Sequence, residues 1–375
     1  MQNNIFLFKF YYQWWKNIDK SIFLLISLLF IIGLFFSLVS TSLIASDKLD
    51  TNSYFFFFKH LIYIFIGIFI IFIFSSLKTN QLFHYSYFLF FITLISLFLV
   101  PIIGVEVKGS KRWIDLFFLP RFQPIELLKP FYIIMISTIL CSVRTSNIYL
   151  KYLLSIVLVS IIALFLIMQP DIGQTLLVIF SWAVLIFTSG VNIFLLFGLS
   201  IIAIISLAYL IMYVPKFDYI QGRIFSFFNR DTGTHNFQSD KAIESITSGG
   251  YFGKGIGEGT LKNRVPEAHT DYIISVISEE FGVVAIILIL LLFLIFIYMV
   301  FKKINFEKDD KIKLVLIGCV SLILMQATIH IGVNIRLFPT TGMTLPFLSY
   351  GGSSIISISI ISGIILNLTK RKIEN

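Results

Sequence analysis

The sequence predicts an all-α polytopic membrane protein of about ten transmembrane helices, with one large extracytoplasmic loop between helices 7 and 8. Of its 375 residues, 57% are hydrophobic and only 13% are charged. Its mean hydropathy is +0.93, which is far more apolar than a soluble domain requires. The apolar residues also fall into runs long enough to cross a bilayer, which takes about 20 helical residues.

Ten runs meet this length and are the expected spans. They cover 21–45, 55–76, 85–103, 123–142, 152–169, 172–189, 191–214, 271–301, 314–335 and 346–368. The first run is too long for the apolar core of a secretory signal, so we expect it to be retained. Residues 21–368 then form one transmembrane domain between an N-terminal tail (1–20) and a C-terminal tail (369–375).

Basic residues predict the orientation. Fourteen lysines and arginines fall on the face that holds both termini, against seven in the short loops of the opposite face. Since cytoplasmic loops accumulate Lys and Arg, both termini should be cytoplasmic and the large loop should face outward.

Cys141 and Cys319 lie near the cytoplasmic ends, so we expect reduced thiols. The net charge of +9 is spread over these loops, which favours anionic lipid over nucleic acid.

The large polar loop, residues 215–270, holds much of the glycine and charge of the chain. Its glycine-rich run, 249–259, follows no strand and precedes no Gly-Lys-Ser/Thr, so a nucleotide-binding loop is not expected. These glycines should instead let the backbone approach a partner or ligand closely. His235 and His269 are too isolated for a zinc site.

Four outward basic residues crowd into the loop before the fourth span: Lys108, Lys111, Arg112 and Arg121. Together with Trp113 they could anchor the protein at lipid headgroups. Alternatively, Lys111, Arg112 and Arg121 could hold the phosphate of an anionic ligand.

The fourth span begins near Gln123 and carries Glu126 and Lys129 on one helix face, where their charges can neutralise each other. Ionisable groups inside a membrane segment usually face a polar cavity and serve function. The alternative is a structural ion pair near the outer interface. Asp171, in the turn before the sixth span, is expected to cap that helix.

Asp271 is the candidate catalytic acid, because it stands where the large loop returns to the membrane, after His269 and Thr270. Thr270 is expected to cap the eighth span and to place Asp271 in its first turn, where capping is again the alternative role. Glu279 and Glu280 lie about two turns further on and are expected to line the same cavity.

The last outer loop, residues 334–354, is rich in proline, threonine and glycine. Its backbone groups need partners, so we expect it to fold back into a cavity lined by protein.

Four motifs in order resemble those of the SEDS family of bacterial cell-wall proteins. They are RWID with FQPIELLK, QPDIGQ, PEAHTDYI with EEFG, and NIRLFPTTGMTLPFLSYGGSS. The resemblance runs from about Gly104 to Ser354 and is strongest to the cell-division branch. The chain departs from the family pattern at Ile125, where Ser or Ala is usual, and at Tyr272, where Phe is common. Neither change affects the acid.

The resemblance implies a peptidoglycan glycosyltransferase that polymerises lipid II, the undecaprenyl-pyrophosphate-linked disaccharide-pentapeptide. It would act at the outer face of the cytoplasmic (inner) membrane, at the division septum. Implied partners are a class B penicillin-binding protein (the septal transpeptidase), other divisome membrane proteins and the undecaprenyl-pyrophosphate glycan, with no nucleic acid. Asp271 would be the essential acid. The expected substrate-binding residues are Lys111, Arg112, Trp113, Arg121, Gln123, Glu126, Lys129, His269 and Thr270.

The residues suit this chemistry. Glycan polymerisation needs a base to deprotonate a sugar hydroxyl, and the pyrophosphate leaving group needs cations. Our hypothesis is that Asp271 is the base, that Arg121 and Lys129 lie near the pyrophosphate, and that the anomeric configuration inverts. No cofactor is required by the sequence, although a divalent cation, Mg or Mn, could assist.

Three alternatives stay open. The chain could be an elongation-type polymerase, or a lipid II flippase with a site among broken helices. It could also be a non-catalytic scaffold of the division machinery, in which case Asp271 would be dispensable.

Overall fold

Each of the ten expected spans contains a helix in the computed structural model, which describes residues 2–41, 54–107, 110–116, 119–142, 147–228, 237–261 and 265–370. The helices are α2 (Lys20–Thr41), α4 (Phe55–Ser76), α5 (Thr79–Ile103), α6 (Pro124–Leu140), α7 (Ile148–Met168), α8 (Ile172–Thr188), α9 (Ile193–Tyr213), α12 (Ile273–Phe306), α13 (Asp310–Asn334) and α14 (Gly352–Leu368). Within the described ranges, six helices are long and apolar enough to cross a membrane, and α8 and α14 are shorter apolar helices. The predicted fold class is therefore confirmed.

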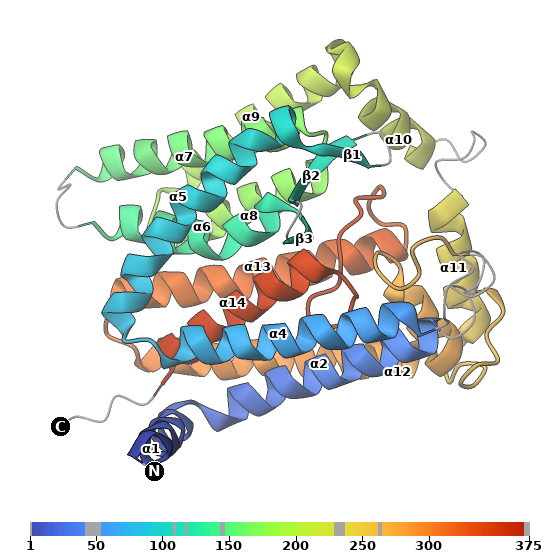
Figure 1. Cartoon of the computed structure of the whole chain (residues 1–375). Helices are drawn as coiled ribbons and strands as arrows, with labels where there is room; N and C mark the ends of the chain where they lie inside the picture. Colours follow the sequence, from blue (N-terminus) through green and yellow to red (C-terminus); the bar gives the residue numbers. More distant parts are fainter. Residues whose placement is uncertain are drawn as a thin grey trace.

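The helices pack side by side, with α13 and α14 in the middle of the bundle (Figure 1). Small residues let α14 approach α4 closely: a Cβ added at Gly67 would lie 2.5 Å from Ser359 Oγ, and one at Gly363 would lie 2.7 Å from Phe74 Cβ. Small residues are typical of such contacts between membrane helices. The outer faces of α4 and α5 expose large apolar side chains such as Phe65 and Phe88.

The N- and C-termini lie at the same end of the bundle, and α10 and α11 lie at the opposite end (Figure 1). This arrangement agrees with an even number of crossings. The expected N-terminal tail contains a helix that was not predicted, α1 (Gln2–Asn17). Its Trp14 packs edge-on against Phe72 of α4 and donates a hydrogen bond to Ser75.

The outer segments are more ordered than the sequence indicated. The loop before α6 forms three antiparallel strands, β1 (Val105–Val107), β2 (Ser110–Leu116) and β3 (Leu119–Phe122). The large polar loop contains a short 3₁₀ helix, η1 (Pro215–Phe217), followed by α10 (Asp218–Phe228) and α11 (Phe237–Gly249). His235 lies outside the described residues.

The last outer loop folds back into the bundle, as expected. Leu345, Phe347 and Leu348 are buried, and the ring of Phe347 packs against Phe30 of α2 at a centroid distance of 5.3 Å. A span beginning at 346 was therefore wrong, because these apolar residues belong to the inserted loop and α14 begins only at Gly352.

A break divides α12 at Gly282, whose φ of 77° and ψ of −179° are not helical. The break frees backbone groups on both sides, and the glycine-rich run of the large loop binds them. Four backbone hydrogen bonds form this loop–helix junction: Val283 N to Gly250 O, Val284 N to Tyr251 O, Lys254 N to Glu279 O and Gly255 N to Glu280 O. The glycine-rich run does approach another backbone closely, but that backbone is α12 of the same chain and not the partner or ligand that the sequence suggested.

Replacing Gly282 with alanine is expected to destabilise the protein strongly. A Cβ there would lie 2.2 Å from the carbonyl oxygen of Tyr251, and the φ of 77° is itself unfavourable for alanine. Overpacking costs about 1–3 kcal/mol, and this backbone conformation costs a further 1–3 kcal/mol or so. Thermal unfolding in detergent measures the loss.

Gly190→Ala is the matched control, because Gly190 has a φ of 89° but no atom within 4 Å of the added Cβ. This variant measures the loss of stability caused by the unfavourable backbone conformation alone, without a steric clash. Equal losses of stability in the two variants would show that the loop–helix junction is not tightly packed.

Candidate active site

Asp271 lies at the end of the bundle that carries α11, in the turn that leads into α12. The helix begins at Ile273 with Tyr272 as its N-cap residue, and no side chain makes the capping hydrogen bond. Thr270 donates instead to the carbonyl and carboxylate oxygens of Glu267. The predicted Thr270 cap, and the placement of Asp271 in the first helical turn, were therefore wrong.

Three outer segments fix the position of Asp271. The buried amide of Asn334, at the end of α13, donates to the carbonyl oxygen of Asp271 at 3.0 Å. The carboxylate lies over Gly342 of the inserted loop, where a Cβ would be 3.4 Å from Oδ2. Tyr350 N donates to His269 O at 3.1 Å. Asp271 is thus set where α12, α13 and the inserted loop meet.

Aromatic side chains surround His269, two residues before Asp271. Its ring lies 4.4 Å from Phe56 of α4 and 6.0 Å from Tyr350. The ring of Tyr350 also contacts Tyr63 of α4. Burial raises the pKa of Tyr350 to about 12, so its phenol stays protonated and can donate at neutral pH.

Glu126 and Lys129 form the expected ion pair, at 2.8 Å, and both are buried. Gln174 of α8 donates to the other carboxylate oxygen of Glu126 at 2.6 Å, and Lys129 donates to Gln326 of α13 at 3.1 Å. The pair therefore joins α6, α8 and α13 inside the bundle. The described side chains enclose Lys129 completely, so this structure does not present it to a pyrophosphate.

The same network continues to the inserted loop. Gln326 donates to the carbonyl oxygen of Thr344 at 3.0 Å, and the Thr344 hydroxyl is 2.7 Å from that of Ser354. Ser353 accepts a hydrogen bond from the backbone of Gln123. These contacts fix the loop that carries Gly342, and so they bear on Asp271 indirectly.

Asp171 caps α8, as expected, by accepting from Gln174 N. It also accepts from the side chain of Gln123 at 2.9 Å and lies 3.7 Å from the Arg112 guanidinium. Burial is the largest influence on Asp171 and raises its pKa, against the opposing attraction of Arg112. Arg112 further donates to the carbonyl oxygens of Gln169 and Pro170, which fixes its orientation.

The other basic candidates stand apart on the strands. Arg121 pairs with Asp115 at 2.9 Å, and both side chains are exposed. Lys111 is exposed opposite Glu106 in the β1–β2 register, and Trp113 is partly buried. The structure therefore joins Arg112 and Gln123 to the buried network and leaves Lys111 and Arg121 accessible to solvent or ligand.

A largely apolar hollow of about 190 Å³ adjoins Arg112. It lies between α8, α10, α13 and the inserted loop, and Gly173 and Thr341 are among its lining residues. A Cβ at Gly173 would lie 2.9 Å from Thr341, so this part of the loop packs directly on α8. A Cβ added at the neighbouring residue, Gly342, would lie 3.4 Å from the Asp271 carboxylate. The inserted loop thus links the hollow to the candidate acid.

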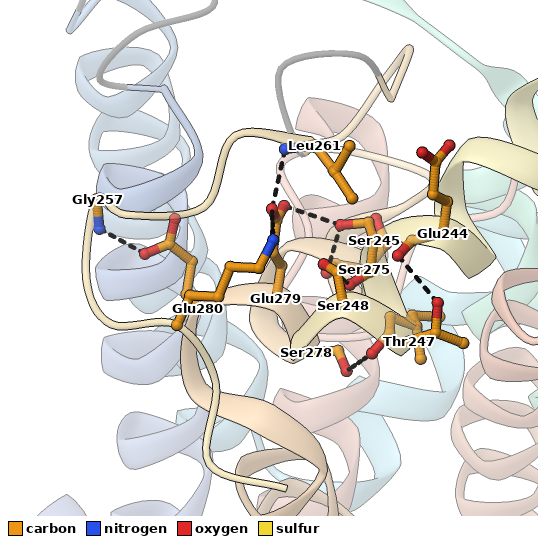
Figure 2. Close-up of polar contacts among 12 residues, drawn as sticks. Glu244, Ser245, Thr247, Ser248, Gly257, Leu261, Ser275, Ser278, Glu279 and Glu280 are labelled. Carbon is orange, nitrogen blue, oxygen red and sulfur yellow. Dashed lines mark hydrogen bonds and ion pairs between the residues drawn. The ribbon is translucent and has the colours of Figure 1, made fainter. Parts of the chain in front are cut away.

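Glu279 and Glu280 do not serve the role that the sequence suggested. Figure 2 shows both carboxylates turned toward the large loop. Glu279 accepts from Leu261 N at 2.9 Å and from the Ser245 hydroxyl at 3.0 Å, and Glu280 accepts from Gly257 N. Both are buried. They reinforce the loop–helix junction and are not shown to line a cavity with Asp271.

Comparison with known proteins decides the family. The model of the family described as "Cell cycle protein", which groups FtsW, RodA and SpoVE, matches residues 19–374. The chain belongs to this family. A protein of Caulobacter vibrioides named "Probable peptidoglycan glycosyltransferase FtsW" is 34% identical over 278 residues, 73% of this chain and 69% of that protein. A relative of the same name in Wigglesworthia glossinidia brevipalpis is 32% identical over 91% of this chain and 90% of that protein.

A solved structure shows the same fold. A chain of a peptidoglycan synthase complex, in a structure concerned with coordinating polymerization and crosslinking, superposes with a TM-score of 0.77. The two chains are 24% identical, and the match covers 94% of this chain and 97% of the other. The SEDS-family resemblance of the motifs is confirmed by the family match over residues 19–374, and the shared fold agrees with it.

Within this SEDS-family chain, several site residues were missed. These residues are amides within apolar helices: Gln174 in α8, and Gln326 and Asn334 in α13. A neutral amide in an apolar helix needs a hydrogen-bond partner, and this need was the signal in the sequence that could have identified them. The described residues contain no group of three His, Cys, Asp or Glu side chains at one point. Assistance by Mg or Mn stays a prediction.

Proposed function

We propose that this chain is a peptidoglycan glycosyltransferase that polymerises lipid II at the outer face of the cytoplasmic membrane. Membership of the family and the names of its relatives support this assignment. The observation that carries it is the position of Asp271 where α12 begins, with its carbonyl oxygen bonded to Asn334 of α13 and its carboxylate beside Gly342 of the inserted loop. The inserted loop connects it to an apolar hollow bordered by Arg112.

In the proposed reaction, Asp271 acts as general base. It takes the proton from the acceptor sugar hydroxyl while that oxygen forms a bond to the anomeric carbon of the donor. The bond from this carbon to the phosphate oxygen breaks, and its electron pair leaves with the pyrophosphate. Direct displacement inverts the anomeric carbon, so an α-linked donor gives a β-linked chain.

Two arginines are candidates to meet the pyrophosphate. Arg121 is exposed, and its bond to Asp115 is at the surface, where exchange for a phosphate is inexpensive. Arg112 lies at the edge of the hollow, whose apolar lining suits a polyprenyl chain. Lys129 is then a positioning residue, since it acts through Glu126 and Gln326. This assignment refines the hypothesis that Lys129 lies near the pyrophosphate.

The proposal also names a partner protein and a location in the cell. A class B penicillin-binding protein would crosslink the new glycan, which is supported by the fold shared with a chain of a peptidoglycan synthase complex. The relatives carry the name FtsW, that of the cell-division branch, which favours a location at the septum over one along the side wall. Both termini would be cytoplasmic, in agreement with their common end of the bundle.

The test supplies lipid II only in the outer leaflet of vesicles that contain the protein and its partner. We expect glycan strands to form, because Asp271, Arg112 and Arg121 would face that leaflet in the proposed orientation. A flippase would make no polymer from lipid II placed there. Absence of strands, with lipid II moved to the inner leaflet, would overturn the proposal in favour of transport.

A further inference from the structure

Three large apolar side chains stand out from the loop–helix junction. Tyr251, Phe252 and Ile256 are 78%, 83% and 64% exposed, and we call them the rim patch. The backbone beneath them is fixed, since residues 250–255 are hydrogen-bonded to residues 279–284 of α12. A cluster of exposed apolar residues on a fixed backbone is typical of a contact surface.

The position of the rim patch along the membrane normal can be estimated from the lengths of α2 and α12. Asp19, which precedes α2, and Lys303 of α12 form an ion pair at 2.7 Å. The pair places the start of α2 and the end of α12 at a similar depth in the membrane. At 1.5 Å per residue, Phe36 lies about 26 Å from this pair along α2, and Phe281 lies about 33 Å from it along α12. The two rings meet at a centroid distance of 5.4 Å.

The hydrocarbon core of a bilayer is about 30 Å thick. If the ion pair marks one edge of that core, Phe36 and Phe281 mark the other. Gly282 follows Phe281, so the break in α12 lies at the outer edge of the hydrocarbon. The rim patch, bonded to Val283 and Val284, lies at the same height.

The rim patch lies between an apolar surface and a polar one, and this position indicates its environment. On one side, α12 exposes Ile287 and Leu288, which belong to its lipid-facing surface. On the other side, the loop continues into the exposed and polar Glu258. An aromatic group between an apolar and a polar surface suits the headgroup region, where Tyr and Trp are enriched.

We propose that the rim patch is a membrane anchor seated in the outer headgroup region. The anchor would hold the large loop at a fixed height. Residues 273–281 of α12 connect the loop–helix junction to Asp271, so the height of the carboxylate over the membrane would be fixed as well. This last consequence, but not the anchor itself, rests on the proposed function.

The test uses Phe252→Cys carrying a polarity-sensitive fluorophore, in a Cys141→Ser, Cys319→Ala background. The protein is reconstituted in phosphatidylethanolamine–phosphatidylglycerol vesicles with a nitroxide lipid labelled near the headgroup. Emission at 252 is expected to be blue-shifted, quenched by the nitroxide and protected from iodide. Glu258→Cys, on the polar side of the same loop, is the matched control and should show the opposite pattern. Ile256→Cys should repeat the result at 252.

Two results would overturn the anchor. Equal quenching by iodide at 252 and 258 would place the rim patch in water. Loss of nitroxide quenching when the class B penicillin-binding protein is added would make it a protein-docking surface. Neither readout needs turnover, so failure of polymerisation in the outer-leaflet assay would leave this test unaffected.

Discussion

Asp271→Asn is expected to lower the rate of lipid II polymerisation by roughly 10²–10⁴-fold, the contribution typical of a general base. The amide cannot accept the proton of the acceptor hydroxyl. It has nearly the same shape as the carboxylate, and the bond from Asn334 to the backbone of residue 271 would remain. The measurement is glycan formation from purified lipid II by the complex with the partner.

Glu258→Gln is the control, because it removes an exposed carboxylate from the same outer face and should leave the rate unchanged. Thermal unfolding of both variants should match that of the parent. A rate for Asp271→Asn within a few-fold of the parent would contradict the assignment and favour a scaffold role.

Lys129→Met should produce a large loss of stability. It leaves the Glu126 carboxylate buried with Gln174 as its remaining hydrogen-bond partner among the described contacts. Breaking one side of a buried ion pair costs about 3–5 kcal/mol. The expected result is a much lower thermal midpoint in detergent, and the double variant Glu126→Gln/Lys129→Met should regain most of it because no charge is left unpaired.

Lys313→Met is a matched control, since Lys313 pairs with Asp310 at the same spacing along a helix but in an exposed position. Such pairs contribute about 0–1 kcal/mol. If Lys129→Met and Lys313→Met lowered the midpoint equally, the buried network would not be what holds α6, α8 and α13 together.

The sequence was sufficient to locate the helices, apart from the start of α14, and to predict the Glu126–Lys129 pair. Both depend on local properties: the length of an apolar run, and the three-residue spacing that puts two charges on one helix face. The insertion of the last loop also followed locally, because its backbone groups needed partners within the membrane protein.

The contacts around Asp271 could not be found in this way. Thr270 looked like a helix cap, but Asn334 and Gly342 set the turn before α12, and both come from distant parts of the chain. Glu279 and Glu280 looked like cavity residues because α12 was taken as continuous. The break at Gly282 brings the N–H groups of Leu261 and Gly257 to their carboxylates.

The central claim is that the Asp271 carboxylate deprotonates the acceptor sugar. A structure of the complex with the partner and an unreactive lipid II analogue, with donor and acceptor sites both filled, tests this claim most directly. The account predicts the acceptor hydroxyl oxygen at about 2.6–3.2 Å from the carboxylate, or joined to it through one water. A hydroxyl that instead contacts another base, with Asp271 turned away from both sugars, would contradict it.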